Sequence, residues 1–261
     1  MQGLSPVASA AQTFSLATAV VFLVVGVVLS VRRGRPHPLL LVSISAASFS
    51  WIEAPYDWAV YAQFPPALPR MPSWWPLNWT WGGGVPESVP LGYVSYFVIP
   101  AVASVAVARW SSAKFQWRIP LSLLTIGLLV GTLWAFLFNG CLGARAGVFH
   151  YGHVIPGLAL WPGTTHQYPL YDCLAMGVQM MVITYLLGRT DSLGRTLIDA
   201  WADARTKSRL GSSLLSVAVV VVIGNAVYLS VFAPHFITKV LHMQTIAPAG
   251  QLYPGVPNQP L

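Results

Sequence analysis

The stretch QTFSLATAVVFLVVGVVLSVRRGR, residues 12–35, is apolar over 12–31 and then strongly basic. About 20 apolar residues form a helix long enough to cross the ~30 Å hydrocarbon core of a bilayer. Arg32, Arg33 and Arg35 follow the apolar run, whereas a cleaved signal peptide carries its basic residues ahead of it. We therefore expect this stretch to be retained as a transmembrane helix.

The rest of the chain has the composition of a membrane-embedded helix bundle. Of 261 residues, 55% are hydrophobic and 8% are charged, against roughly 25% charged in a soluble domain. Stretches long and apolar enough to span a bilayer are 12–31, 38–61, 90–109, 120–140, 168–188 and 212–232. The sequence predicts an all-α, polytopic protein of the cell membrane with about six transmembrane helices, folded as one domain over 1–261 with a tail at 233–261.

Basic residues are concentrated in three of the predicted connections. The connections after the first, third and fifth spans hold eleven of the 14 basic residues, and the positive-inside rule places such connections in the cytoplasm. Both termini and the connections 62–89 and 141–167 are then expected on the other side. The orientation of the protein in the membrane accounts for the net charge of +7. No nucleic-acid partner is expected, because the basic residues form no single patch.

The longest cytoplasmic connection, 189–211, is expected to hold a short surface helix. Arg195, Asp199, Asp203 and Lys207 are spaced four residues apart, the spacing at which opposite charges pair along a helix. We interpret this segment as solvated and partly interfacial, without a catalytic role.

Two carboxylates lie inside the second predicted span, in WIEAPYDW at 51–58. Glu53 and Asp57 are four residues apart and share one helix face. A carboxylate inside a membrane costs about 2.5–3.5 kcal/mol and normally faces the bundle interior or a wet cavity. With no Lys or Arg beside them, desolvation and mutual repulsion favour the neutral, proton-donating form of the pair. Pro55 removes a backbone hydrogen bond and is expected to kink the helix and widen a pocket.

Glu87 and Asp172 are expected at the same outer end, because each lies near the outer end of a predicted span. We predict that these acids line one cavity with Glu53 and Asp57, which would act as the acid–base pair, and that Asp172 is a further catalytic carboxylate. The alternative is structural, with the acids hydrogen-bonding neighbouring helices.

The two long outer connections are rich in aromatic and histidine side chains. The first, 64–90, carries tryptophans that suit either an aromatic belt at the membrane interface or a lid that stabilises a cation. The second, 139–172, is long for a turn, and its histidines suit acid–base roles, so we predict His153, His166 and Tyr171 as catalytic helpers. Predicted substrate contacts are Trp58, Tyr61, Trp79, Trp81, Glu87, Tyr93, Tyr96, Tyr151, Gln167 and Tyr168.

Other patterns indicate packing rather than chemistry. His150 and His153 are not accompanied by a recognisable metal-ligand pattern, and the sequence has no phosphate-binding Gly loop, so we expect no metal and no cofactor. Gly127 and Gly131 form a small-xxx-small pair that suits close helix packing.

The segment after 232 carries five prolines, which argues against a seventh spanning helix. We expect it to lie along the outer surface, with His235 either solvated or bordering the cavity. Cys141 and Cys173 both fall at the outer end, where a disulfide is geometrically conceivable, and the sequence leaves their pairing open.

Three blocks resemble a known family. WIEAPYDWAVYAQF (51–64), GYVSYFVIPA (92–101) and HVIPGLALWPGTTHQYPLYD (153–172) are similar to segments of the AveC-like spirocyclase family of actinobacterial membrane proteins. The resemblance covers roughly residues 38–188. It implies spiroketal formation in a polyketide, in which two hydroxyl groups add to a ketone with loss of water.

The residues suit such chemistry independently of the resemblance. Ketalisation needs a general acid, a general base and a dry pocket that tolerates an oxocarbenium ion, and it needs no cofactor. A lipophilic small-molecule substrate reaching the site through the lipid bilayer is the expected partner. Two alternatives stay open: a membrane terpene cyclase that protonates an olefin or epoxide, and a proton-coupled transporter or lipid-binding subunit, although no internal repeat typical of transporters is seen.

Overall fold

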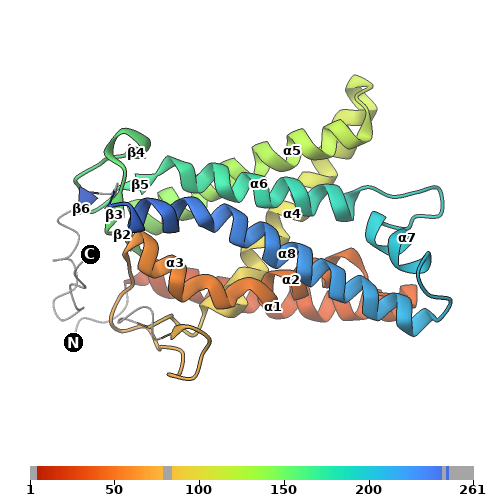
Figure 1. The fold of residues 1–261 in the computed structure, drawn as a ribbon, viewed down its shortest axis with the longest axis horizontal. Helices are drawn as coiled ribbons and strands as arrows, with labels where there is room; N and C mark the ends of the chain where they lie inside the picture. The colour runs from red at the N-terminus through yellow and green to blue at the C-terminus, as the bar shows by residue number, and fades with distance from the viewer. Residues whose placement is uncertain (1–4, 79–83, 243–244, 247–261) are drawn as a thin grey trace.

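Residues 5–78, 84–242 and 245–246 are described by the computed structural model, in which long helices pack side by side into a bundle (Figure 1). Within these residues, six helical segments are long and apolar enough to cross a membrane. Their bounds are α1 Pro6–Arg33; α2 Pro38–Phe49, continued by the 3₁₀ turn η1 Ser50–Ile52 and by α3 Glu53–Val60; α4 Val89–Phe115; α5 Ile119–Ala135, continued by the π-helix η3 Phe136–Arg145; α6 Leu170–Gly188; and α8 Arg209–Val240. The predicted all-α class is confirmed, and each predicted span has its helical segment.

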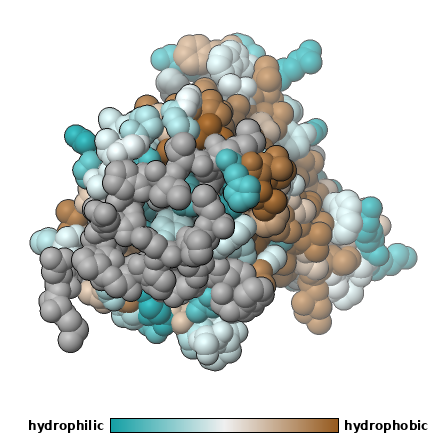
Figure 2. Space-filling model, turned by 60° about the vertical axis from the view of Figure 1, so that its left-hand side comes forward, coloured by the Kyte–Doolittle hydropathy of each residue, from teal (hydrophilic) through white to brown (hydrophobic). Residues whose placement is uncertain are grey.

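Apolar side chains cover much of the flank of the bundle (Figure 2). On α1, Val20, Val21 and Val24 are 52%, 55% and 57% exposed. Large exposed aliphatic surfaces are costly in water and mark contact with another apolar phase. The surface is therefore compatible with a multi-pass membrane protein.

Local sequence signals set the helix ends. α1 begins at Pro6, and the Ser5 hydroxyl accepts a hydrogen bond from the Ala8 N–H at 3.1 Å. It ends at Gly34, whose φ of 66° is the left-handed conformation that closes helices. α2, α4 and α5 also carry proline in their first two positions, where the missing N–H costs nothing.

The second spanning segment is interrupted near Pro55, as predicted. The 3₁₀ turn η1 separates α2 from α3 just ahead of this proline, which cannot donate to the carbonyl four residues earlier. α3 starts at Glu53, so Glu53 and Asp57 lie one helical turn apart. It ends at Tyr61, which adopts a left-handed φ of 52°.

The last helix is longer than predicted. α8 continues past 232 to Val240 with Pro234 inside it, because a proline is tolerated in a long helix whose neighbours satisfy the freed backbone groups. The extension carries His235 and Lys239 into the interior, where they are 1% and 5% exposed. The predicted surface tail at 233–261 is thus wrong for its first residues, which belong to α8, and residues 243–244 and 247–261 of it lie outside the described residues.

Short antiparallel strands gather at one end of the bundle, hereafter the strand end (Figure 1). β1 Ala62–Gln63 pairs with β2 His150–Tyr151, and β4 Ala159–Leu160 pairs with β5 Tyr168–Pro169. A third pair joins β3 His153–Val154 to β6 Thr245–Ile246. The connection after α3, the connection before α6 and the segment after α8 are thereby held together.

The opposite end, hereafter the α7 end, is held by ion pairs. α7 Leu197–Asp203 lies in the connection where a short helix is predicted, and Asp199 caps its first turn. Asp199 pairs with Arg33 at 3.0 Å, and Asp203 pairs with Arg35 at 3.2 Å. A short helix is present as predicted, but the predicted pairing along it is wrong. Among the described residues, Arg195 pairs with Asp191 and Asp203 rather than with Asp199, and Asp199 is 1% exposed rather than solvated.

α5 and α6 pack closely through glycine. A Cβ at Gly127 would lie 2.9 Å from the Cα of Met181, and one at Gly131 would lie 3.1 Å from the Cα of Gly177. The predicted packing role of this glycine pair is confirmed, since these distances leave no room for a side chain. Cys141 and Cys173 near the strand end of the same helices are free thiols.

Gly131→Ala tests this close approach. The added Cβ would lie 2.5 Å from the Cβ of Met180, so we expect the free energy of unfolding to fall by about 1–3 kcal/mol. The matched control is Gly92→Ala in α4, whose Cβ would meet only Ser15 at 3.9 Å and should be neutral or stabilising by up to about 1 kcal/mol. Unfolding in denaturing detergent measures both variants, and equal stability would contradict the packing assignment.

Single-cysteine labelling tests the orientation predicted from the basic residues. Ser73 and Thr164 are exposed on connections of the strand end, whereas Ser192 is exposed at the α7 end. In a Cys141→Ser background, a membrane-impermeant maleimide should label Ser73→Cys and Thr164→Cys in intact cells and Ser192→Cys only after permeabilisation. The reverse pattern would overturn the orientation.

Candidate active site

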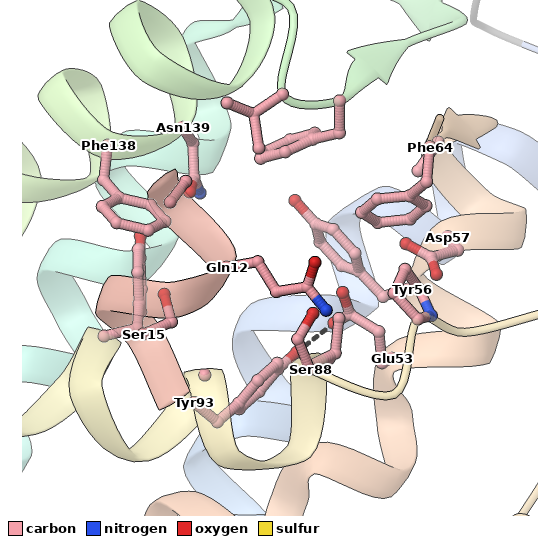
Figure 3. A pocket seen from close by; sticks show the side chains of 18 of the residues that line it. Gln12, Ser15, Glu53, Tyr56, Asp57, Phe64, Ser88, Tyr93, Phe138 and Asn139 are labelled. Carbon is pink, nitrogen blue, oxygen red and sulfur yellow. Dashed lines mark hydrogen bonds between the residues drawn. The ribbon is translucent and has the colours of Figure 1, made fainter. Parts of the chain in front are cut away.

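A cavity of about 160 Å³ lies near the strand end, between α1, α3, α4 and η3 (Figure 3). Apolar cavities of ~150 Å³ accept a benzene-sized ligand, so this one accommodates at least one ring of a small molecule. Its polar lining residues are Gln12, Ser15, Glu53, Tyr56, Asp57, Ser88, Tyr93, Tyr96, Asn139, Tyr151 and Tyr228. The rest of the lining includes Phe64, Phe97, Phe138, Phe149 and smaller apolar side chains.

Glu53 is part of a buried hydrogen-bonded chain. The Tyr93 hydroxyl donates to Glu53 Oε2, and the hydroxyl groups of Tyr93 and Tyr228 are 2.6 Å apart. Glu53 is 9% exposed and faces the cavity from the first turn of α3. This series of hydrogen bonds connects an acid on α3 with tyrosines on α4 and α8.

Asp57 lines the same cavity one turn further along α3. It is 1% exposed, and neither of its carboxyl oxygens has a hydrogen-bond partner among the described residues. The sequence suggests no cation beside it, but the fold brings Arg70 close enough for an electrostatic attraction. The Arg70 guanidinium donates to the carbonyls of Phe64 and Gly84 at 3.2 and 3.1 Å, so it also holds the connection that follows α3.

Asp172 lies behind the cavity wall and is fully buried. Tyr56 donates to its Oδ1 at 2.5 Å, and Asn139, Tyr151 and Tyr168 donate to its Oδ2 at 3.0, 3.3 and 3.1 Å. These four donors satisfy both oxygens of the buried carboxyl group. Three of the four donors also line the cavity, so Asp172 sets the orientation of cavity side chains without lining the cavity itself.

Tyr151 and Tyr168, which precede α6, stay protonated in this arrangement. Burial, followed by the charge of Asp172, raises the pKa of each hydroxyl well above its ordinary value. A protonated phenol can donate to the carboxylate. The predicted substrate contact Tyr151 therefore lines the cavity, but its hydroxyl donates a hydrogen bond to Asp172. Tyr168 also donates to Asp172 and does not line the cavity.

The histidines of the 139–172 connection do not line the cavity, although Phe149 and Tyr151 of the same connection do. His153 stacks on Tyr61, with ring centroids 4.7 Å apart, and His166 Nδ1 lies 3.1 Å from the Ala144 carbonyl oxygen. Tyr171 packs against His235, with ring centroids 4.9 Å apart. The structure thus does not bring the predicted helpers His153, His166 and Tyr171 into the cavity.

Neighbouring residues of this connection have structural contacts as well. His150 Nδ1 lies 2.8 Å from the Thr165 carbonyl oxygen, and burial lowers the pKa of its imidazole. Gln167 Nε2 donates to the Tyr151 carbonyl at 2.8 Å. This predicted substrate contact therefore fixes the strand that carries Tyr151.

The other predicted substrate contacts divide into four groups. Tyr93 and Tyr96 line the cavity, whereas Glu87 is exposed to solvent. Trp58 and Tyr61 pack under Lys239, whose ammonium lies 4.9 and 5.5 Å from their ring centroids. The two remaining predicted contacts, Trp79 and Trp81, lie outside the described residues.

Six polar cavity residues are missed by the sequence analysis: Gln12, Ser15, Tyr56, Ser88, Asn139 and Tyr228. Tyr56 shares a face with Glu53 three residues earlier, a signal within the octapeptide itself. Asn139 and Tyr228 are polar residues at or within predicted spans, which is a weaker signal, and Gln12 lies at the start of the first span. His235 is also placed near the site, since its Nε2 lies 3.8 Å from Asp172 Oδ1.

No group of three or more His, Cys, Asp or Glu side chains suited to holding a metal ion is found within residues 5–78, 84–242 and 245–246.

Comparison with known protein families identifies the chain. A family model described as "Spirocyclase AveC-like" matches residues 31–259, nearly the whole chain. The chain belongs to this family. No curated protein and no solved structure matches the chain. The match extends on both sides of the blocks that suggest the resemblance, from the end of α1 to the segment after α8, and it includes every cavity residue except those of α1.

Substitution of Asp172 tests its part in assembling the spirocyclase-like site. Asp172→Ala leaves four buried donors without their acceptor, so we expect the free energy of unfolding to fall by about 2–5 kcal/mol. Asp172→Asn keeps one carbonyl acceptor, so its free energy of unfolding should fall by less than that of Asp172→Ala. The exposed acid Asp191, changed to Asn, serves as control and should change stability by less than about 0.5 kcal/mol. An Asp172→Ala protein as stable as wild type would show that the four hydrogen bonds contribute nothing.

Proposed function

We propose that this family member is a membrane-embedded, cofactor-independent cyclase that forms a spiroketal from a lipophilic dihydroxyketone by carboxylic acid–base catalysis. The observation that carries the proposal is the pair of acids on α3. Asp57 is buried in the cavity without a hydrogen-bond partner in the described chain, while Glu53 one turn away accepts a hydrogen bond from Tyr93. Two acids in different environments can divide the roles of proton donor and proton acceptor.

The proposed reaction is redox neutral and loses one water. One substrate hydroxyl adds to the ketone carbon and gives a hemiketal. Protonation of the hemiketal hydroxyl breaks its C–O bond. Water is released, and the remaining fragment is an oxocarbenium ion. The second hydroxyl then attacks that carbon and gives up its proton, which closes the spiroketal.

We assign the protonation of the leaving hydroxyl to Asp57. A buried carboxyl group without hydrogen-bond donors is expected in its neutral form, which carries the proton to be transferred. We assign Glu53 to the proton released by the attacking hydroxyl, because its link to Tyr93 and Tyr228 provides donors that stabilise a carboxylate. The phenolic rings of Tyr93 and Tyr96 in the lining suit a cationic intermediate, since aromatic faces attract positive charge.

Tyr56 and Asp172 support this assignment from the other wall. The hydrogen bond from Tyr56 to Asp172 holds the carboxyl oxygens of Asp172 close behind the cavity wall, where they would favour a developing cation. This arrangement replaces the direct catalytic role that the sequence suggests for Asp172. Asp172 is here a positioning residue for Tyr56, Asn139 and Tyr151.

We further propose that the six long helices cross the cell membrane with the strand end away from the cytoplasm, as the distribution of basic residues predicts. The cavity would then lie at the outer-leaflet level, and a lipophilic substrate would enter from the bilayer. A terpene cyclase would use the same acids and aromatic rings, but the amide and hydroxyl groups of Gln12, Ser15 and Asn139 in the lining favour an oxygenated substrate.

Cyclisation of nonan-5-one carrying a hydroxyl at each end tests the proposed function. The spiroketal product is chiral, so spontaneous closure gives a racemate and closure in a chiral cavity gives an excess of one enantiomer. The purified protein in nanodiscs should raise the rate and produce such an excess, measured by chiral gas chromatography. A racemic product at the uncatalysed rate would contradict the proposal for this class of substrate.

Glu53→Gln and Asp57→Asn test the assigned roles. Each change preserves size but removes the transferable proton, so the catalysed rate should fall by ~10²–10⁴, while unfolding in denaturing detergent changes little. Asp191→Asn, at the α7 end, is the matched control and should keep wild-type activity. If both α3 variants fold and retain the wild-type rate and enantiomeric excess, the acids are structural.

A further inference from the structure

One wall of the cavity comes from α1, which lies almost wholly outside the family match. α1 contributes Ala8, Ala11, Gln12 and Ser15 to the lining, whereas the match begins at residue 31. Ala8 and Ala11 are small, so Gln12 is the longest side chain that this wall offers to a ligand. The acids face it from α3, within the matched part of the chain.

The position of this wall is fixed by contacts between α1 and α4. The Ser95 hydroxyl donates to the Ser15 carbonyl at 2.6 Å, and the Thr18 hydroxyl donates to the Ser95 oxygen at 2.7 Å. At the other end of α1, Gly26 lies against Leu40, where an added Cβ would be 3.1 Å from its backbone. The register of α1, and with it the place of Gln12, is therefore set by the fold.

Three polar side chains at this wall and beside it, Gln12, Ser15 and Ser88, make no side-chain hydrogen bonds within the described part of the chain. Gln12 reaches from α1 toward Glu53 and Ser88 (Figure 3). Its amide makes no hydrogen bond within the described part of the chain, nor do the hydroxyls of Ser15 and Ser88. An amide offers two donors and one acceptor, and each hydroxyl offers a donor and an acceptor. These groups are available to a ligand.

The charge of the lining narrows the ligand class. Among the described lining residues, Glu53 and Asp57 are acidic and none is Lys, Arg or His. An anionic ligand would find no countercharge there, and amide and hydroxyl groups suit a neutral hydroxyl or carbonyl oxygen.

We propose that Gln12, with Ser15 and Ser88, forms a subsite that binds a hydroxyl group of a neutral, oxygenated, lipophilic substrate, and that α1 thereby sets substrate specificity. The subsite rests on the proposed function in that it holds the same substrate that the α3 acids convert. It faces those acids across the cavity, so one bound oxygen would fix which part of the substrate reaches Asp57. Gln12 is a binding residue, and the transferred protons stay with the acids.

Binding of two matched ketones tests the subsite without relying on turnover. The probes are nonan-5-one with a hydroxyl at each end and nonan-5-one itself, and the readout is the dissociation constant from ligand-induced thermal stabilisation of the protein in nanodiscs. Every protein compared in this binding measurement also carries Asp57→Asn, so that the dihydroxyketone is not converted during it. Gln12→Leu keeps the bulk of the side chain and removes its hydrogen bonds. It should weaken binding of the dihydroxyketone by about three- to tenfold, as expected for one neutral hydrogen bond, and leave nonan-5-one binding unchanged.

Thr13→Leu, on the exposed face of the same helix, is the matched control and should bind both ketones as the wild type does. Equal binding of the dihydroxyketone by wild type and Gln12→Leu overturns the subsite, as does an equal loss for both ketones. Failure of the wild type to bind the dihydroxyketone overturns the ligand class. If the wild type binds it in a Gln12-dependent way but gives only racemic product at the uncatalysed rate, the proposed function fails and the subsite stands.

Discussion

Burial of the Asp172 carboxylate is the constraint on which the architecture of the strand end depends. Its hydrogen-bond donors come from four elements: α3, η3, β2 and β5. A buried charge is tolerated only when such donors surround it, so the four elements must meet at α6 in one arrangement. The cavity is the space left on the near side of that cluster. Its shape therefore follows from the requirement to satisfy one acid.

The three buried acids of this end show how environment separates identical functional groups. Asp172 has four donors, Glu53 has Tyr93, and Asp57 has no hydrogen-bond partner in the described chain. The fold thus places a stabilised charge, a partly supported carboxyl and an unsupported carboxyl around one small volume. An arrangement made only for stability would leave no buried acid unsupported, since each such group costs free energy. Asp57 is the buried acid that the hydrogen bonds of the described chain support least, which is why we propose it as the proton donor.

Hydropathy and spacing predict much of this protein because the bilayer length and the helical repeat are fixed quantities. The six spans, the glycine contact of α5 with α6 and the shared face of Glu53 and Asp57 all follow from them. The extension of α8 through Pro234 does not, because the neighbours that satisfy its backbone are distant in sequence. For the same reason the sequence could not show that Arg70 approaches Asp57, or that the histidines of the 139–172 connection pack behind the cavity. Orientation of loop side chains depends on strand pairings such as β1 with β2, which hydropathy does not encode.

The π-helical geometry of η3 has a consequence for how this protein can vary. Phe138 and Asn139 face the cavity from η3, whose turns are one residue wider than those of the α-helix before it. Wider turns of this kind correspond to one extra residue in the helix. Deleting one residue ahead of Asn139 would remove that extra residue and close the turn toward α-helical geometry, so that Asn139 would shift by one position and lose its hydrogen bond to Asp172. The number of residues between α5 and Asn139 therefore matters to the cavity wall as much as the identity of Asn139 does.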